Sequence, residues 1–350
     1  MPPSANKEGL TMQRLKPRQE RSIDPHLLAD CILFVGFFLV FWATRGSRFM
    51  KPSIFKSIMY QFPEYGLLAL GVMLALICGG NDLSTVGVGN LVSILTALWV
   101  SKFVPADISG VPAVGVILLM FVSAIAIGAL CGTFTAFLIH KLNIPAFIAT
   151  IGTLRLYTGI GIGITDGQAV SGIPAVYTRF IQYCFFDFIP VPVILFALGA
   201  LLVAFLLNKT SYGVDVRMQG SNSVAARFAG VRKFRTYLIT YMVSGALAAV
   251  SGLIMLGRMS SAKSDYGTSY TLISILICIL GGVSPNGGKG RTLGVLLAVL
   301  ILQLVTSGMA LYSSINTFYN TMIFGLLLIS ALIFNYYIEK AARKKELGGK

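Results

Sequence analysis

The stretch LICGGNDLSTVGVGNL, residues 76–91, interrupts a long apolar run with paired glycines, an asparagine and an aspartate. It predicts that a membrane-spanning helix breaks or re-enters near residues 79–90. Backbone groups freed by such a break must lie inside the protein or face a water-filled cavity. Two interpretations of Asp82 stay open: its carboxylate borders a path through the membrane, or it caps the helix that follows.

The composition indicates a multi-pass membrane protein. The chain has 350 residues, of which 55% are hydrophobic and 12% charged, whereas soluble domains have about 45–50% and about 25%. The net charge of +15 is spread over short loops and two tails, which argues against nucleic-acid binding. The five cysteines lie far apart without a CxxC or His/Cys cluster, so we predict no metal site and no disulfide framework.

The hydrophobic runs predict an all-α membrane protein with about ten transmembrane helices. A helix that crosses the bilayer takes about 17–25 apolar residues. The predicted spans are roughly 27–43, 64–80, 84–103, 112–139, 145–163, 189–207, 236–257, 268–283, 292–310 and 315–337. Residues 26–338 then form one transmembrane domain, between a basic, disordered cytoplasmic tail at 1–25 and a second basic tail at 339–350.

The basic residues predict that both termini are cytoplasmic, because cytoplasmic loops carry an excess of Lys and Arg. With this orientation most of the 28 basic residues lie inside. The predicted loop 44–63 opposes it, because it would place four basic residues outside: Arg45, Arg48, Lys51 and Lys56.

The stretch IPAFIATIGTLRLYTGIGIGITDG, residues 144–167, carries polar groups inside a predicted span. Thr150, Thr153 and Tyr157 share one helix face. That face meets either a polyhydroxyl solute or a neighbouring helix, and for the threonines and glycines we favour helix packing. Arg155 is a full charge within the span, for which we expect a functional or a strong structural partner.

Residues 208–235 form the longest polar segment after the N-terminal tail. Ser221 or Asn222 is placed to cap a short helix that carries Ala225 and Ala226, and Gly230 is placed to end it. Such a helix suits docking of a soluble partner, or alternatively lies on the bilayer surface, which its arginines also suit.

A glycine-rich stretch, GGVSPNGGKGRT at residues 281–292, resembles a phosphate-binding loop. A P-loop needs G-x-x-x-x-G-K-[ST] after a strand, but Val283 replaces its first glycine and Gly290 follows the lysine. The stretch therefore predicts a short inside connection without a nucleotide, in which Lys289 and Arg291 add inside charge. Because HExxH, GxSxG and paired carboxylates are also missing from the sequence, we predict no catalytic residues and no cofactor.

Five motifs occur in one order along the chain: GGNDLSTVG (79–87), PAFIATIGT (145–153), GSNSVAARFAGV (220–231), SGALAAVSGLI (244–254) and GGVSPNGGKG (281–290). With them the chain resembles the monosaccharide branch of bacterial ABC-transporter permeases, typified by the ribose, xylose, arabinose and galactoside systems. Two positions depart from that branch. Asn81 replaces the usual isoleucine, and Thr158 stands where an arginine is often found, so the resemblance does not identify the sugar.

The resemblance implies a permease subunit of an importer in the bacterial cytoplasmic (inner) membrane. Its partners would be a second permease subunit, identical or not, cytoplasmic ABC ATPase subunits that use the ATP, and an extracytoplasmic sugar-binding protein. The transport path would run between the two permease subunits. The residues expected to line it are Asn81, Asp82, Thr153, Arg155 and Tyr157. The residues expected to couple to the ATPase are Gly220, Asn222, Ala225, Ala226, Arg227 and Gly230, with Lys289 and Arg291 on a second ATPase-facing loop.

Alternative functions stay open on the sequence. One is an ABC permease for another small polar solute, such as a branched-chain amino acid or an autoinducer-like molecule. Another is an ion-coupled secondary transporter, which would need carboxylates deep in the bundle. Asp82 and Asp30 are the carboxylates that we expect near the apolar core. A third is a membrane scaffold or exporter component.

Overall fold

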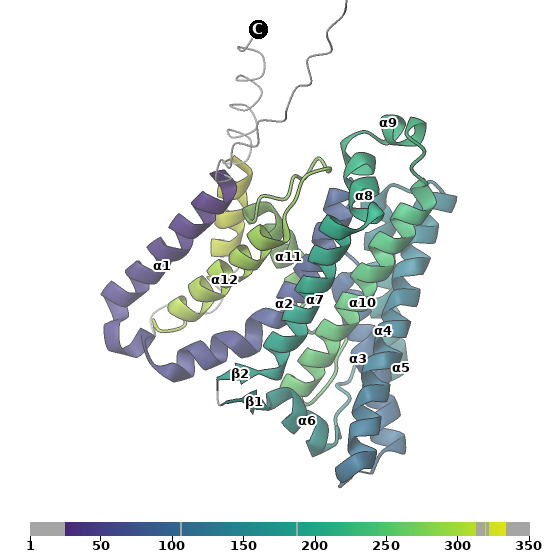
Figure 1. Ribbon diagram of the computed structural model, residues 1–350. Coiled ribbons are helices and arrows are strands. Elements are labelled where there is room, and N and C mark those ends of the chain that lie inside the picture. Colours follow the sequence, from purple (N-terminus) through teal and green to yellow (C-terminus); the bar gives the residue numbers. More distant parts are fainter. Residues whose placement is uncertain (1–24, 106, 187, 313–318, 320–321, 334–350) are drawn as a thin grey trace, which may run out of the picture.

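The computed structural model describes residues 25–333, apart from 106, 187, 313–318 and 320–321 (Figure 1). These residues are almost entirely helical. The elements are α1 (Pro25–Phe49), α2 (Pro52–Ile77), α3 (Thr85–Phe103), α4 (Gly110–Lys141), α5 (Ala146–Thr165), α6 (Ala175–Gln182), β1 (Cys184–Phe185), β2 (Ile189–Pro190), α7 (Val191–Lys209), α8 (Ser211–Ser221), α9 (Ser223–Phe228), α10 (Lys233–Met259), α11 (Tyr270–Leu280) and α12 (Thr292–Met309). A further apolar helix covers Met322–Ile333.

The predicted all-α membrane architecture is confirmed. Among the described residues, eight helices are long and apolar enough to cross a membrane: α1 to α5, α7, α10 and α12. The predicted spans 268–283 and 315–337 correspond to shorter apolar helices, α11 and Met322–Ile333, and part of the second span lies outside the described residues. The predicted tails lie outside them too, except Pro25, which begins α1. The orientation in the membrane stays a prediction.

The boundary between the first two spans differs from its prediction. The sequence placed a loop at 44–63, but α1 continues to Phe49 and α2 already begins at Pro52. Proline suits this first position of a helix because its ring fixes φ and its missing N–H would be unpaired there. The basic cluster that opposed the predicted orientation therefore lies mostly on helix ends and not in a long loop. One of its members, Arg45, has its guanidinium carbon 3.9 Å above the ring of Tyr312.

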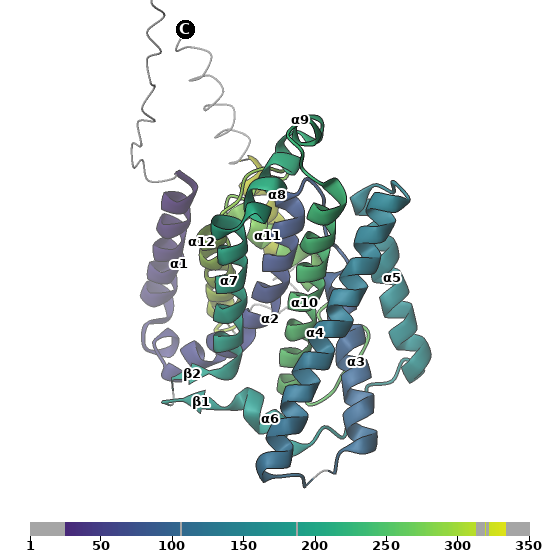
Figure 2. The same cartoon turned by 45° about the vertical axis from the view of Figure 1, so that its right-hand side comes forward.

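Helix α10 forms the centre of the bundle and packs against α2, α3 and α4 (Figure 2). Its approach to α4 depends on glycines. A Cβ at Gly245 would overlap the carbonyl oxygen of Gly128, and a Cβ at Gly132 would overlap that of Tyr241. Small residues let membrane helices approach this closely. The glycines of the SGALAAVSGLI motif therefore set the spacing of the core.

The two ends of the bundle carry different elements. Helices α8 and α9 lie at one end, and α6 with the β1–β2 hairpin lies at the other (Figure 1). Helix α5 lies at the edge of the bundle, where it contacts α3 and α4 (Figure 2).

Candidate transport path and coupling site

The predicted interruption of the second span is present, and it is shorter than predicted. Residues 78–84 connect α2 to α3, whereas 85–90 already belong to α3. The carboxylate of Asp82 is 2% exposed. One of its oxygens accepts from the backbone N–H of Ser84 at 3.0 Å and from the Ser84 hydroxyl at 2.6 Å. The other accepts from the Ser244 hydroxyl of α10 at 2.6 Å. The capping interpretation of Asp82 is wrong, because the N-cap of α3 is Ser84 and no side chain caps the helix. The Asp82 contacts instead hold the turn before α3 and tie it to α10.

Asn81, beside this carboxylate, is placed differently. Its side chain is half-buried, and its amide oxygen is buried without a hydrogen-bond donor among the described residues. Its backbone oxygen accepts a long bond, 3.4 Å, from the Tyr241 hydroxyl. The neighbouring Gly80 packs against Ala146 at the start of α5. Of the five predicted path residues, Asn81 is thus the one that the structure leaves with an unsatisfied buried polar atom.

The polar stripe on α5 faces the rest of the bundle. Tyr157 is buried and donates to the carbonyl of Cys131 on α4 at 2.8 Å. The buried Thr153 donates within its own helix to the carbonyl of Ala149 at 3.1 Å. Thr150 does the same to Phe147 at 3.2 Å. These contacts agree with the favoured packing interpretation for the threonines.

The packing interpretation holds for Gly161, whose added Cβ would lie 2.7 Å from the Ser264 hydroxyl oxygen, but the opposite face of α5 is open. A Cβ at Gly152, Gly159 or Gly163 would meet nothing within 4 Å. The side chain of Arg155 is exposed. Thus Arg155 does not lie with Thr153 and Tyr157, because a residue two positions along a helix points to another side.

The predicted coupling segment contains two helices, α8 and α9, although the sequence predicted only the second. The side chain of Asn222 caps α9, because its oxygen accepts from the backbone N–H groups of Val224 and Ala225 at 3.0 Å each. Gly230 ends α9 with φ +85°. Its N–H bonds to Arg227 and the next N–H bonds back to Ala226, as in a Schellman motif. The predicted cap and stop are both confirmed.

Helix α9 is exposed on all sides but one. Ala226 is fully buried, whereas Val224 is 63% and Phe228 89% exposed. The side chains of Ala225 and Arg227 are exposed as well. Two apolar side chains one turn apart, beside an arginine, form a small surface that a protein partner can cover.

Helix α8 holds α9 firmly on the bundle. Arg217 donates to the carbonyl of Leu207 at the end of α7 at 2.6 Å. The hydroxyls of Tyr212 and Thr240 lie 2.8 Å apart, and since Thr240 donates to Thr236, Tyr212 is the donor of that pair. Burial raises the pKa of the Tyr212 phenol above its ordinary value, so it stays protonated. Helix α8 is therefore bonded to both α7 and α10.

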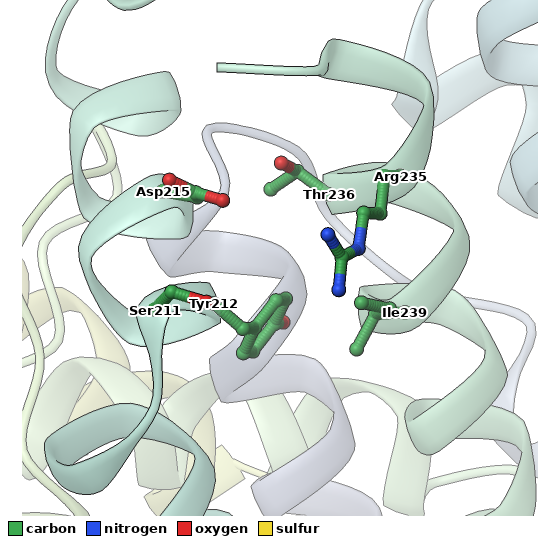
Figure 3. Close-up of a pocket in the computed structure, with 6 residues that line it drawn as sticks. All are labelled: Ser211, Tyr212, Asp215, Arg235, Thr236 and Ile239. Atoms are coloured by element: carbon green, nitrogen blue, oxygen red, sulfur yellow. The ribbon is translucent and has the colours of Figure 1, made fainter. Parts of the chain in front are cut away.

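A small cleft separates α8 from α10 beside these bonds (Figure 3). Asp215 of α8 and Arg235 of α10 point into it from opposite sides, and Tyr212 lines it as well. Opposite charges on the two walls favour a closed arrangement of the two helices.

Three of the sequence motifs meet at the end of α8. Gly220 packs against Gly79 of the α2–α3 connection and against Gly287 and Gly288 of the glycine-rich loop. The N–H of Gly288 donates to the carbonyl of Ile77 at 2.9 Å. Lack of side chains allows three backbones to come together here. The glycine-rich loop thus supports the coupling segment. This packing accounts for its glycines without a bound phosphate.

Lys289 and Arg291 lie beside this junction, and both side chains are exposed. The backbone oxygen of Lys289 accepts from Ser284 at 3.0 Å and closes the loop. The structure therefore brings the glycine-rich loop next to α8. Whether the two side chains face an ATPase stays a prediction.

Sequence reasoning missed a buried ion pair at the other end of the bundle. Glu64 of α2 is fully buried, and Arg258 of α10 donates to both of its carboxylate oxygens, one of them at 2.9 Å. Tyr270 contributes a longer bond of 3.4 Å. The expectation that Asp82 and Asp30 are the carboxylates near the core was thus incomplete. The predicted span 64–80 began at Glu64 and so treated it as a boundary residue, but α2 starts twelve residues earlier at Pro52.

Long apolar helices around a glycine-packed core, with a capped and exposed helix at one end, define a multi-pass helical membrane protein. A family model described as "Branched-chain amino acid transport system / permease component" matches residues 54–332. The chain belongs to this permease family.

Three similar proteins are permeases as well. The chain is 31% identical to the ribose import permease protein RbsC of Bacillus subtilis, covering 92% of this chain and 98% of the relative. It is 34% identical to the L-arabinose transport system permease protein AraH of Escherichia coli, covering 91% and 89%. It is 27% identical to the autoinducer 2 import system permease protein LsrD of Yersinia pestis, covering 84% and 86%. No solved structure matches the chain significantly.

These findings confirm the resemblance to ABC-transporter permeases that the five motifs carried. They also agree with the predicted place of the chain as a multi-pass protein of the cytoplasmic (inner) membrane.

Proposed function

We propose that this chain is the permease subunit of an ATP-binding-cassette importer that moves a monosaccharide into the cell. ATP would be hydrolysed on a partner ATPase subunit, and a sugar-binding protein would deliver the solute from outside. The observation that carries this proposal is the junction at Gly220, where the interrupted span, the coupling segment and the glycine-rich loop meet. The relatives that import ribose and arabinose support the sugar.

Motion of the ATPase would enter through α9. Phe228 and Val224 offer the exposed apolar contacts, and Arg227 adds a positive charge at the same surface. Helix α8 is bonded to α7 and α10, so a push on α9 would be transmitted to the bundle and would not be absorbed by a loose loop. The junction at Gly220 would then pass the motion to the α2–α3 connection beside Asp82.

The open face of α5 suits a second permease subunit and the path between the two. Gly159 and Gly163 form a G-x-x-x-G pair with nothing within 4 Å of either added Cβ, and such pairs let membrane helices approach closely. Arg155 is exposed on a membrane-spanning helix, where an unpaired charge is costly. Water, a solute hydroxyl or the second subunit would satisfy it there. Asn81 would offer its free amide oxygen to a solute near the start of α5.

Reconstitution tests the proposal. The chain would be placed in proteoliposomes with its ATPase, with internal ATP and with a sugar-loaded binding protein outside. We expect uptake of ribose or arabinose that requires ATP and continues when the proton gradient is collapsed. Uptake that needs the gradient and no ATP would replace the proposal with an ion-coupled transporter.

A second solute class follows from the relative that imports autoinducer 2. The same vesicles would be offered this solute and branched-chain amino acids in place of the sugar. ATP-dependent uptake of one of these, without uptake of any pentose, would keep the ABC mechanism and exclude the sugar.

A further inference from the structure

A groove of about 300 Å³ lies between the first turns of α4 and helix α6. These two elements lie at the end of the bundle away from α9 (Figure 2). Val114 and Ile117 form part of its wall on α4. Phe180 of α6 packs against Phe121 of α4 with ring centroids 6.3 Å apart. Arg179 adds a positive charge to this largely apolar lining. The groove therefore offers an apolar trough with a cation beside it.

Helix α6 uses one face for the bundle and another for the groove. Tyr177 and Ile181 are buried, and the Tyr177 hydroxyl donates to the carbonyl of Leu253 on α10 at 2.7 Å. The groove is lined by Val176, Arg179 and Phe180, at i, i+3 and i+4 of α6, and by Tyr183, which follows the helix. Since α6 is already packed on α10, it presents this second face as a fixed surface.

The surroundings place the groove at the level of lipid headgroups. Val111 and Val114 at the start of the membrane-spanning helix α4 are 86% and 59% exposed, and such an apolar face suits contact with lipid. The β1–β2 hairpin next to α6 exposes Phe185, Phe186 and Phe188. Tyr183, which lines the groove and is 56% exposed, is of a residue type enriched where the membrane meets water.

We propose that this groove binds one phospholipid with an anionic headgroup. The phosphate pairs with the guanidinium of Arg179, whose planar fork matches phosphate oxygens. The first part of an acyl chain lies along Val114 and Ile117 and continues over the exposed face of α4. An amphiphile is the occupant that matches both parts of the surface, because a purely apolar ligand would make no use of the exposed Arg179 guanidinium beside the apolar wall. The site does not depend on which solute the permease carries.

Native mass spectrometry of the full-length protein tests this proposal, using mixed micelles with equal phosphatidylglycerol and phosphatidylcholine of the same chains. We expect the wild type to retain phosphatidylglycerol about fivefold over phosphatidylcholine, as one basic residue near a lipid surface provides. Arg179→Gln should bring this ratio to about one. Lys102→Gln removes an exposed cation from α3 outside the groove and should leave the ratio unchanged. Val114→Trp fills the trough and should reduce retention of both lipids.

Two results would overturn the proposal. One is an Arg179→Gln protein that keeps the wild-type lipid ratio. The other is a benzophenone amino acid at position 114 that crosslinks to a second copy of the chain, or to another protein, in place of lipid.

Discussion

Gly220→Ala should impair ATP-driven uptake without preventing the ATPase subunit from binding, because three backbones meet at this residue. A Cβ at position 220 would overlap the carbonyl oxygen of Ile77 and would lie 2.6 Å from the backbone nitrogen of Gly288. Neither neighbour is the end of a flexible side chain, so a backbone must move. Overpacking of this kind costs about 1–3 kcal/mol, and loss of the Gly288–Ile77 hydrogen bond costs roughly 1 kcal/mol more.

The two costs together give a loss of about 2–4 kcal/mol in the free energy of unfolding, concentrated where α8 meets the glycine-rich loop. We expect ATP-dependent uptake in proteoliposomes to fall by at least tenfold, while the ATPase subunit still binds. Chemical denaturation in mixed micelles measures the stability, and uptake together with ATP hydrolysis measures coupling.

Gly115→Ala is the matched control. An added Cβ at Gly115 of α4 meets nothing within 4 Å, so it should leave both stability and uptake unchanged. Wild-type uptake and stability in the Gly220→Ala protein would refute the junction as the coupling element. Equal damage from both variants would show that any alanine in this bundle is harmful and would refute the contact argument.

Three further changes test other parts of the molecule. Ala226→Glu buries a charge in the α9 contact and should abolish uptake while ATP hydrolysis continues. Ser223→Glu adds the same charge at an exposed position and should leave the fold intact. Normal uptake in a well-expressed Ala226→Glu protein would contradict the docking role. Glu64→Gln leaves Arg258 without its buried counter-charge and should cost about 3 kcal/mol of stability. Adding Arg258→Met should recover much of that loss in denaturation measurements, and a purely additive double mutant would argue against the ion pair. Arg155→Gln should change uptake with little effect on unfolding, and the reverse pattern would assign Arg155 a structural role.

Much of the membrane architecture could be predicted because hydrophobicity is a property of each segment alone. A run of apolar residues long enough to cross the bilayer is stable as a helix there whatever surrounds it. The same locality explains the success at α9. The cap at Asn222 and the stop at Gly230 depend on hydrogen bonds between residues only a few positions apart. Such signals are readable without knowing the fold.

Helix boundaries near polar residues were less predictable. Glu64 and the basic residues near the end of α1 and the start of α2 looked like loop positions because charge is costly in lipid. In the fold, Arg258 offsets the Glu64 charge from a helix almost two hundred residues away in sequence. A single segment contains no trace of such a partner, so the prediction began this span too late.

The sequence by itself determined the class of this protein, its helical membrane-spanning segments and the local geometry of its coupling helix. It also excluded a nucleotide site in the glycine-rich loop, since Val283 and Gly290 break the required spacing. Only the tertiary structure decided which face of α5 is open, where Asp82 places its carboxylate, and that Gly79, Gly220 and Gly288 meet. The physical reason is that these features depend on close approach between distant backbones, and a glycine permits such an approach without specifying its partner.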